Sequence, residues 1–509
     1  MLAALAAVAG GASACGSSPG GGPGDPAGAA PASAPVYLEV TLRPDGRQAA
    51  DLRRLAGTVL GTGDPAAQVV AWLDEAGRPE GVSFSRDVEP WLGAKGAIAL
   101  LDTSRGGARG GGGGDTQAVA ILASTDDAEA AAALRKIAGA GAREVEYRGV
   151  PVRQRGDDVA AAVHDGRVLV GSGAGVRASI DALEGDSLAD TDRLRQGRDA
   201  VAGEGIGFGL VDPRALFRRA TAAGGGATPL LAPLAEALPE LVALRLSTER
   251  DALALDAVAV GGRATAGALS GAGAADAVAA LPGDAWLGLG VADLGGTFGA
   301  VLETVGGKGL GGLGVAQLEA AVRQATGLSL REDVLAWMGD GALYGVGDGD
   351  RGPSGGLVVQ SKDAEQSARV VRLLGPLLRS FGQADVTELD GPGIDAGWRV
   401  ARGDAPPLLL AAGGDRVVVA TSRDALRAGL STGGARLGDD DAFRGAAAQL
   451  GGGLRPSLWL DIPAMVRGAG DRIPGDPRVR RALEALGPLV GGAKPDGDDT
   501  RARMRLAIG

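Results

Sequence analysis

The sequence predicts an α+β fold in two similar copies, each with a largely antiparallel sheet covered by helices. Apolar runs of strand length follow one another along the chain, with segments of helical periodicity between them, and this order favours antiparallel pairing. Four segments of the first half recur in the same order in the second half. Hydrophobic residues make up 45% of the 509 residues, which is enough to build a sizeable core.

The first copy begins with a β-rich run, VYLEVTL, at residues 36–42. An amphipathic helix is expected next, because apolar side chains recur at i, i+3, i+4, i+7 and i+8, on Leu52, Leu55, Ala56, Val59 and Leu60. We interpret the glycine loop at 106–114 as an insertion, because the offset between the copies changes there. The run QAVAILAS at 117–124 then has the composition of a buried strand.

Helix and hairpin patterns continue in order after this strand. Thr125 is expected to cap a helix, as Ser361 does in the second copy, with acidic side chains in the positively polarised first turn. Asp165-Gly166 between two apolar runs predicts a type I′ hairpin turn. The remaining elements of the copy are two stretches of strand, a helix and a late hairpin, at 143–154, 159–172, about 176–183 and 241–260.

The internal duplication is the clearest pattern in the chain. The matching segments are 87–100 with 332–346, 124–139 with 360–375, 164–172 with 413–422, and 208–220 with 457–469. We therefore expect both copies to have the same fold, with Trp91 equivalent to Trp337 and Asp212 equivalent to Asp461. The domain boundaries that follow are 36–262 for the first repeat, 263–280 for a junction and 281–509 for the second repeat.

The N-terminal segment predicts secretion and lipid anchoring. Residues 1–14 are uncharged and apolar, as in the core of a signal peptide, and are too few to span a membrane. Ala12-Ser13-Ala14-Cys15 resembles the bacterial lipobox, with Ala12 where Leu is usual, which makes Cys15 the predicted site of lipidation. The Gly/Ser/Pro-rich residues 15–35 are expected to form a flexible tether. The predicted location is extracytoplasmic, on the outer face of the cell membrane.

Composition excludes several classes of function. The net charge of −11 and the aromatic content of 3% argue against nucleic acid as a partner, because phosphate binding needs clustered positive charge and bases stack on aromatic side chains. One His and one Cys leave no set of residues for a Cys/His zinc site or an intrachain disulfide. We expect neither a cofactor nor a metal.

Short motifs that resemble catalytic or binding sites have simpler explanations. Gly307-x-Gly309-x-x-Gly312 matches the dinucleotide pattern, but three spaced glycines arise by chance in a chain with 90 glycines. Gly171–Gly175 is expected to cap a helix. Gly429–Gly433 fits the string of a nucleophile elbow around Ser431, yet a helix precedes it and the single histidine, His164, lies upstream. Asp439–Asp441 is expected to begin a helix.

The whole plan resembles the bacterial family known as domain of unknown function 3352, which is common in actinobacteria. The resemblance rests on the tethered start, on Pro90-Trp91-Leu92-Gly93 and on the duplicated strand–helix–hairpin order, and it covers roughly residues 36–509. It implies an extracytoplasmic, membrane-tethered body. It supplies no activity and no catalytic residues.

Three functional hypotheses follow. The first is a non-enzymatic, lipid-anchored binding or structural module of the cell envelope, whose partners are the membrane and an envelope protein. The second is a carrier of a lipid or another apolar ligand, enclosed between layers of small and aliphatic side chains. The third and weakest is a hydrolase that uses only carboxylates, for which no acidic pair is singled out by spacing.

Overall fold

The computed structural model describes residues 24–101, 117–139, 141–156, 159–223, 238–261, 270–306, 315–347, 353–380, 385–401, 403, 406–469 and 477–509. The chain divides into two compact units. The first consists of Met1–Ala223 with Glu240–Val258, and the second of Gly224–Pro239 with Ala259–Gly509. The predicted repeat boundary at residue 262 thus lies close to the structural boundary at Val258.

The first unit alternates strands and helices as follows: η1 (Pro26–Ala29), β1 (Val36–Thr41), α2 (Gly46–Leu60), α3 (Pro65–Gly77), η2 (Arg78–Glu80), α4 (Phe84–Asp87), β2 (Leu92–Leu100), β3 (Ala118–Ser124), α5 (Asp127–Ala138), β4 (Arg143–Tyr147), β5 (Val150–Arg155), β6 (Val159–His164), β7 (Arg167–Gly171), α6 (Gly173–Leu183), η3 (Leu188–Asp190), α7 (Asp192–Ala200), β8 (Gly207–Val211), α8 (Pro213–Ala223), β9 (Leu241–Thr248) and β10 (Ala252–Val260).

The second unit has the elements α11 (Ala272–Ala279), β11 (Leu287–Val291), α12 (Leu294–Gly306), α13 (Val315–Thr326), η4 (Leu330–Leu335), β12 (Met338–Gly347), β13 (Pro353–Ser361), α14 (Ala364–Ser380), β14 (Asp385–Glu388), β15 (Ala396–Ala401), β16 (Leu408–Gly413), β17 (Arg416–Ala420), α15 (Arg423–Leu430), η6 (Leu437–Asp439), α16 (Asp441–Ala448), β18 (Pro456–Leu460), α17 (Ile462–Ala469), α18 (Pro477–Glu484), β19 (Leu486–Asp496) and β20 (Asp499–Ile508).

Both units arrange their strands in the same order. In the first unit the order is β10-β9-β8-β1-β2-β3-β7-β6-β5-β4, and in the second it is β20-β19-β18-β11-β12-β13-β17-β16-β15-β14. Every pair with a described register is antiparallel, from β1 with β2 to β19 with β20. The predicted α+β class with largely antiparallel sheets is confirmed. The internal duplication stays an interpretation, to which the shared strand order adds weight.

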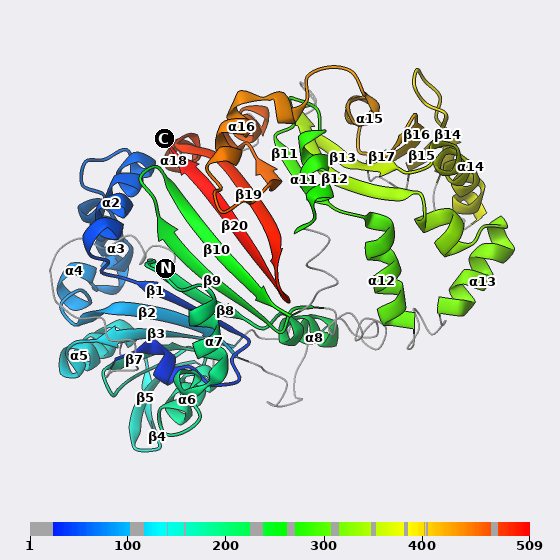
Figure 1. Cartoon of the computed structure of the whole chain (residues 1–509). Helices are drawn as coiled ribbons and strands as arrows, with labels where there is room; N and C mark the ends of the chain where they lie inside the picture. Colours follow the sequence, from blue (N-terminus) through cyan, green and yellow to red (C-terminus); the bar gives the residue numbers. More distant parts are fainter. Residues whose placement is uncertain are drawn as a thin grey trace. The chain divides into compact units, whose positions relative to one another are not determined.

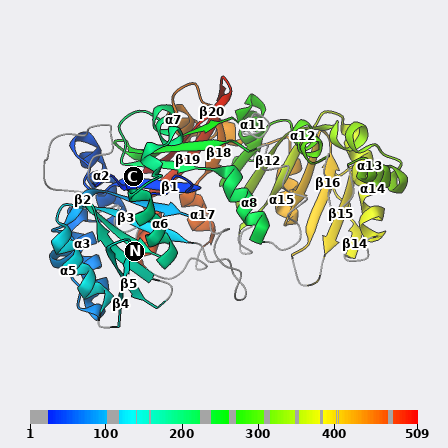
Figure 2. The ribbon, with the colours of Figure 1, turned by 90° about the horizontal axis from the view of Figure 1, so that it is seen from below.

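Helices cover both faces of each sheet. In the first unit, α5 and α6 both contact β6, and the apolar cluster beneath α4 and α5 contains Trp91. Figure 1 shows where α4, α5 and α6 lie around the strands of this unit. In the second unit, one cluster joins α11, α15 and α16 to the sheet, and the other lies beneath α14 and contains Trp337. Figure 2 shows α11, α14 and α15 beside the strands of this unit. Burial of these two faces is the main source of stability in each unit.

The two tryptophans occupy corresponding places. Trp91 and Trp337 are 3% and 4% exposed, and each precedes the first residue of a strand that bulges at its start. The carbonyl of Trp91 accepts from the N–H of Thr125, and that of Trp337 accepts from the N–H of Lys362. Their indole nitrogens differ: Trp91 donates to the carbonyl of Asp87, whereas within the described residues Trp337 has no acceptor.

Two local predictions have different outcomes. Asp165 and Gly166 adopt φ angles of 50° and 71°, so the type I′ turn between β6 and β7 is confirmed.

Thr125 and Ser361 are not the helix caps. Asp126 caps α5 by accepting from two backbone N–H groups, and Asp363 accepts from the N–H of Gln366. Thr125 lies one residue before the cap position, and its hydroxyl donates to the carbonyl of Trp91.

The N-terminal segment that directly precedes β1 is part of the folded body. Residues 15–35 were expected to form a flexible tether, but residues 25–35, which we call the strap, are packed on the first unit. Ala27, Ala29 and Ala30 are fully buried. Residues 1–23, with the predicted signal peptide and Cys15, lie outside the described residues. The tether prediction is therefore wrong for the strap, because its small side chains fit against the sheet and its backbone bonds to the body.

The predicted junction at 263–280 is corrected in the same way. Its residues from Ser270 onward belong to the body of the second unit, where α11 lies against β11 and β18. Glycines in β11 make this close approach possible. A Cβ on Gly290 would lie 1.9 Å from the carbonyl oxygen of Ala274, and one on Gly288 would lie 2.9 Å from Leu281 Cδ1. The residues 262–269 lie outside the described part of the chain.

We therefore expect Gly290→Ala to lower the free energy of unfolding of the second unit by about 2–3 kcal/mol, because the added methyl group forces α11 off the sheet. The measurement is urea unfolding followed by circular dichroism. Gly445→Ala is the matched control: it lies in α16 with open space around it, and alanine there should stabilise by about 0.5–1 kcal/mol. Equal effects of the two substitutions would contradict this account of the packing.

Candidate functional site

A buried carboxylate is the centre of the best-defined polar cluster in the first unit. The side chain of Glu39 on β1 is 9% exposed, and three donors surround it. Lys95 Nζ lies 2.9 Å from Oε1, Arg198 Nη2 lies 3.2 Å from Oε2, and the Tyr37 hydroxyl donates to Oε2 at 2.8 Å. Arg198 also lies 3.9 Å from Asp25, the first residue of the strap. The cluster therefore joins a strand, a helix and the strap.

The sheet and α7 place these side chains. Tyr37 and Glu39 are two residues apart on β1, so both side chains point to the same face of the sheet. Lys95 on β2 pairs with Thr41, which lies two residues after Glu39 and so points to that face too. Arg198 comes from α7, which Thr191 caps by accepting from the N–H of Leu194. The Arg198 guanidinium also stacks 5.7 Å above the ring of Phe208 on β8.

Charge and burial act in opposite directions on this cluster. Burial raises the pKa of Glu39. The neighbouring Lys95 and Arg198 charges and the hydrogen bonds of the cluster lower the pKa by more than burial raises it, so the net pKa lies below its usual value. Burial, followed by the Glu39 charge, raises the pKa of Tyr37 well above its usual value. At neutral pH the cluster thus holds an ionised carboxylate and a protonated phenol.

Three arginines contact the strap, two of them through its backbone carbonyls and one through the Asp25 carboxylate. Arg193 Nη2 donates to the carbonyls of Ala32 and Ala34, at 3.1 and 2.8 Å. Arg167, 5% exposed, donates from Nε to the carbonyl of Asp25 at 2.9 Å. Arg198 supplies the contact to the Asp25 carboxylate. Together they fix a segment whose own side chains are too small to bury much area.

The second unit fills the corresponding space without charge. In the second unit, Gly288 of β11 pairs with Trp459 of β18, whereas at the equivalent pair of the first unit Tyr37 of β1 pairs with Leu210 of β8. The large aromatic side chain therefore lies on β1 in the first unit and on β18 in the second. Trp459 is 2% exposed, donates to the carbonyl of Ala285 at 3.1 Å and packs edge-on against Phe443. The polar cluster is thus a property of the first unit, and it breaks the symmetry between the units.

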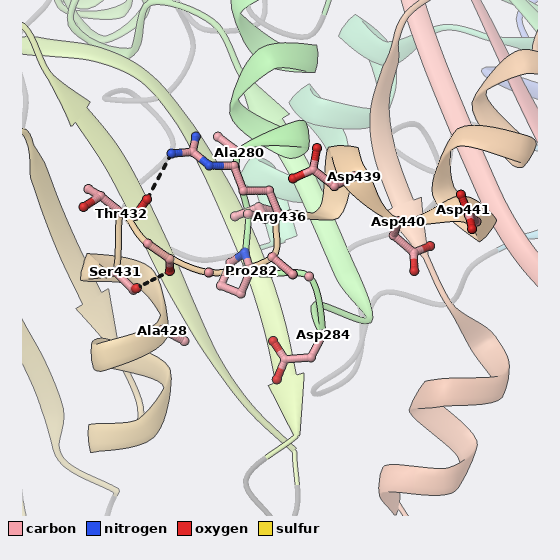
Figure 3. A pocket seen from close by; sticks show the side chains of 15 residues that line it. Ala280, Pro282, Asp284, Ala428, Ser431, Thr432, Arg436, Asp439, Asp440 and Asp441 are labelled. Carbon is pink, nitrogen blue, oxygen red and sulfur yellow. Dashed lines mark hydrogen bonds between the residues drawn. The ribbon is translucent and has the colours of Figure 1, made fainter.

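A pocket of about 600 Å³ lies in the second unit, and it brings together two motifs that the sequence singled out. Figure 3 shows Ser431 on one side, the acidic residues Asp439, Asp440 and Asp441 on the other, and Arg436 between them. The Ser431 hydroxyl donates to the carbonyl of Gly433 at 2.7 Å, and Arg436 donates to the carbonyl of Thr432 at 3.2 Å.

The pocket residues have structural roles. Ser431 follows α15, so the strand-to-helix turn of a nucleophile elbow is not formed there. Asp440 caps α16 by accepting from the N–H of Phe443 at 2.8 Å, as the prediction of a helix start requires, and Asp441 pairs with Arg444. His164 ends β6 in the first unit, opposite Arg167.

Other predicted positions also serve the fold. Ser172 and Ser422 cap α6 and α15. Asp212 and Asp461 accept from the N–H groups of Ala215 and Ala464 at 2.8 Å each, so both end a strand and cap the next helix. Gly307–Gly312 and the loop 106–114 lie outside the described residues, as does Cys15.

No three His, Cys, Asp or Glu side chains come together as metal ligands in the described part of the chain. Nor does any helix there combine the length and the hydropathy needed to cross a bilayer.

Sequence reasoning missed the Glu39 cluster. The one hint was Glu39 itself, a charged residue in the middle of a β-rich run. Its two charged partners lie 56 and 159 residues further along the chain, counted from residue 39 to residues 95 and 198, so no local spacing relates them to Glu39.

Comparisons place the chain among known proteins. The model of the family described as "Protein of unknown function (DUF3352)" matches residues 1–474. No curated protein matches. Solved structures titled "Structure of crystal form III of TP0453" and "Structure of crystal form I of TP0453" match with 10% and 11% identity, a TM-score of 0.26 each, and coverage of 46% of this chain and 79% and 78% of theirs.

Glu39→Gln should lower the free energy of unfolding by about 1–3 kcal/mol at neutral pH, because a neutral amide loses the charge-assisted contacts with Lys95 and Arg198. The folded pKa of Glu39 lies below its usual value, so the stabilisation is present above about pH 4.5 and is lost as the pH falls through the folded pKa. The difference between wild type and variant, measured by urea unfolding from pH 7 to pH 3, should therefore shrink in acid.

Glu144→Gln is the control for this experiment. Glu144 pairs with Arg153 on the neighbouring strand, but its side chain is 51% exposed. Its replacement should cost at most about 0.5 kcal/mol at any pH. A Glu39→Gln effect that stays constant down to pH 3 would refute the proposed ionisation of Glu39.

Proposed function

The chain belongs to the family described as Protein of unknown function (DUF3352), and from this premise we propose that it is a lipid-anchored, extracytoplasmic module of the cell envelope that binds or supports another component without catalysing a reaction. The observation that carries the proposal is the arginine-held strap. It joins the N-terminal end of the chain, where Cys15 lies, to the sheet of the first unit.

A short connection supports this role. Only residues 16–23 separate Cys15 from Gly24, where the described chain begins. Nine residue steps reach at most about 30 Å when fully extended. A lipid on Cys15 would therefore keep the first unit within that distance of the bilayer surface. The 21-residue tether expected from sequence would have given a looser attachment.

The pockets support binding more than chemistry. The pocket beside Ser431 is lined by capping carboxylates and loop atoms, and the other described pocket, about 430 Å³, lies on α2 beside Arg53, Arg54 and Thr58. In the first pocket the Ser431 hydroxyl donates to a backbone carbonyl and Asp440 caps a helix, so both side chains are already engaged in the fold. A partner protein of the envelope is the occupant we propose.

In the native host, globomycin should block processing of the chain, and mass spectrometry should find diacylglycerol on Cys15 of the mature protein. Cys15→Ser should move the protein from the membrane fraction to the soluble fraction. Ser13→Thr is the matched control, because it changes the same segment and keeps the cysteine. A mature protein without lipid in the culture medium would refute the anchor.

A second candidate function is the transport of an apolar ligand. Each sheet has an aliphatic pair that is incompletely covered, at equivalent positions of the two units. The pair is Leu38 on β1 with Ile98 on β2 in the first unit, and Leu289 on β11 with Leu343 on β12 in the second. Leu38 and Leu343 are 43% and 45% exposed. Exposed aliphatic side chains in the middle of a sheet are a feature of surfaces that bind apolar molecules.

Native mass spectrometry of the protein purified from its own host tests this alternative. A carrier should retain lipid, and the double variant Leu38→Asp, Leu343→Asp should lose it. Val479→Asp is the control, because Val479 is equally exposed, at 46%, but lies on α18 rather than on the sheet. Ligand-free wild-type protein that takes up no added lipid would exclude a carrier.

A further inference from the structure

One face of the sheet in the second unit carries leucines in two neighbouring register rows, which we call the leucine face. In the first row, Leu343 on β12 pairs with Leu289 on β11, and Leu289 pairs with Leu458 on β18. The second row begins two residues away on β11 and continues over β18 and β19 to β20. Its leucines, in that order, are Leu287, Leu460, Leu489 and Leu506. Residues two apart on a strand point to the same side, so both rows lie on one surface.

The leucine face retains exposed aliphatic surface. Leu343 is 45% exposed, and the other six leucines are half-buried. The residues that alternate with them point to the opposite face, where Tyr344, Trp459 and Val490 belong to the main apolar cluster and are at most 2% exposed. One face is therefore fully covered at these strands, and the other is not. Contiguous exposed apolar surface of this kind marks binding sites.

The first unit has smaller residues at the equivalent positions. From β3 over β2 and β1 to β8, its row consists of Ala120, Ile98, Leu38 and Gly209. From β13 over β12 and β11 to β18, the row of the second unit consists of Leu357, Leu343, Leu289 and Leu458. Leucine thus stands in place of alanine at one end of the row and in place of glycine at the other. The enlarged aliphatic surface belongs to the second unit, and the first unit is an internal reference for it.

Both rows are apolar along their length from β12 to β20. Gly491 on β19 and Met504 on β20 complete the first row. Gly345 on β12, which pairs with Leu287, begins the second row. A Cβ on Gly345 would lie 2.6 Å from Trp286 Cζ2, so the ring of Trp286 covers this glycine. An indole therefore closes one end of a surface that is otherwise aliphatic.

An acyl chain fits the composition and the length of the leucine face better than a protein partner does. Protein interfaces depend most on Trp, Tyr and Arg anchors, and leucine is under-represented among them. Five neighbouring strands at a spacing of about 4.8 Å give each row a length of about 19 Å. An acyl chain in a bilayer spans about 15 Å, which is half of a hydrocarbon core of about 30 Å. Each row is therefore long enough for one such chain.

We propose that the leucine face of the second unit binds one acyl chain of a lipid, with Trp286 at one end of the chain. The proposal rests on the second candidate function, the transport of an apolar ligand. It assigns that ligand to one unit and one surface, and it names an unbranched alkyl chain as the group that is recognised. Binding removes the exposed leucine side chains from water, which is the source of the affinity.

Quenching of tryptophan fluorescence by a brominated fatty acid tests the site. The probe is dibromostearate, titrated into the delipidated full-length protein, because its bromines quench an indole only on contact. Trp286 and Trp72 are half-buried, and the other four tryptophans are at most 7% exposed. Trp286→Phe should remove at least half of the quenching, whereas Trp72→Phe, on α3 of the first unit, should keep it. Unchanged quenching in Trp286→Phe would overturn the proposal.

Leu343→Asn and Leu38→Asn form a matched pair of variants, because the two leucines are 45% and 43% exposed on the sheets of the two units. Both substitutions are at exposed side chains, so circular dichroism should show that both variants are folded. Leu343→Asn should raise the dissociation constant of dibromostearate at least fivefold, and Leu38→Asn should leave it within twofold of the wild-type value. Equal weakening in the two variants would refute the assignment to the second unit and leave the transport of an apolar ligand standing.

The carrier function and the proposed site can fail separately. Protein that carries lipid when purified from its host, but shows no quenching by dibromostearate once delipidated, would refute the site and keep the carrier. Protein that is free of lipid in its host, but binds dibromostearate with the expected response of Leu343→Asn, would refute the carrier and support the site.

Discussion

The carboxylate of Glu39 lies where a strand, a helix and the N-terminal strap meet, and its need for cationic partners organises this side of the first unit. An ionised carboxylate removed from water is strongly unfavourable unless charges and hydrogen bonds compensate it. Lys95, Arg198 and Tyr37 provide that compensation, and Arg198 extends it to Asp25. The docking of α7 and the docking of the strap are therefore parts of one electrostatic arrangement.

The second unit shows that the same strand order does not require this arrangement. Glycines at positions 288 and 290 let α11 approach the sheet, and the indole of Trp459 fills space from the neighbouring strand. Close packing demands that volume removed at one position be restored nearby, and here it is restored across a strand pair. The first unit thus has a buried charge cluster where the second has a buried indole.

Local patterns predicted local structure well where a single residue pair decides the conformation. Asp165-Gly166 specified its turn because only a few residues adopt two successive positive φ angles. The helix caps were predicted one or two residues early. Thr125 and Asp126 are both good capping residues, and Asp126 is the cap because the helix begins at Asp127. The Thr125 hydroxyl donates instead to the carbonyl of Trp91, which lies in a distant part of the chain.

Fold class, element order and the match of Trp91 and Asp212 with Trp337 and Asp461 follow from sequence patterns, because periodicity and turn residues act over short stretches of chain. That the strap is folded and that Glu39 is a centre of charge becomes evident from the three-dimensional packing. Small residues such as those at 25–35 have the composition of a linker whether or not a surface is available to them. Their docking requires the surface that buries the alanines and the arginines Arg167, Arg193 and Arg198, which come from distant segments and meet only when the sheet has formed.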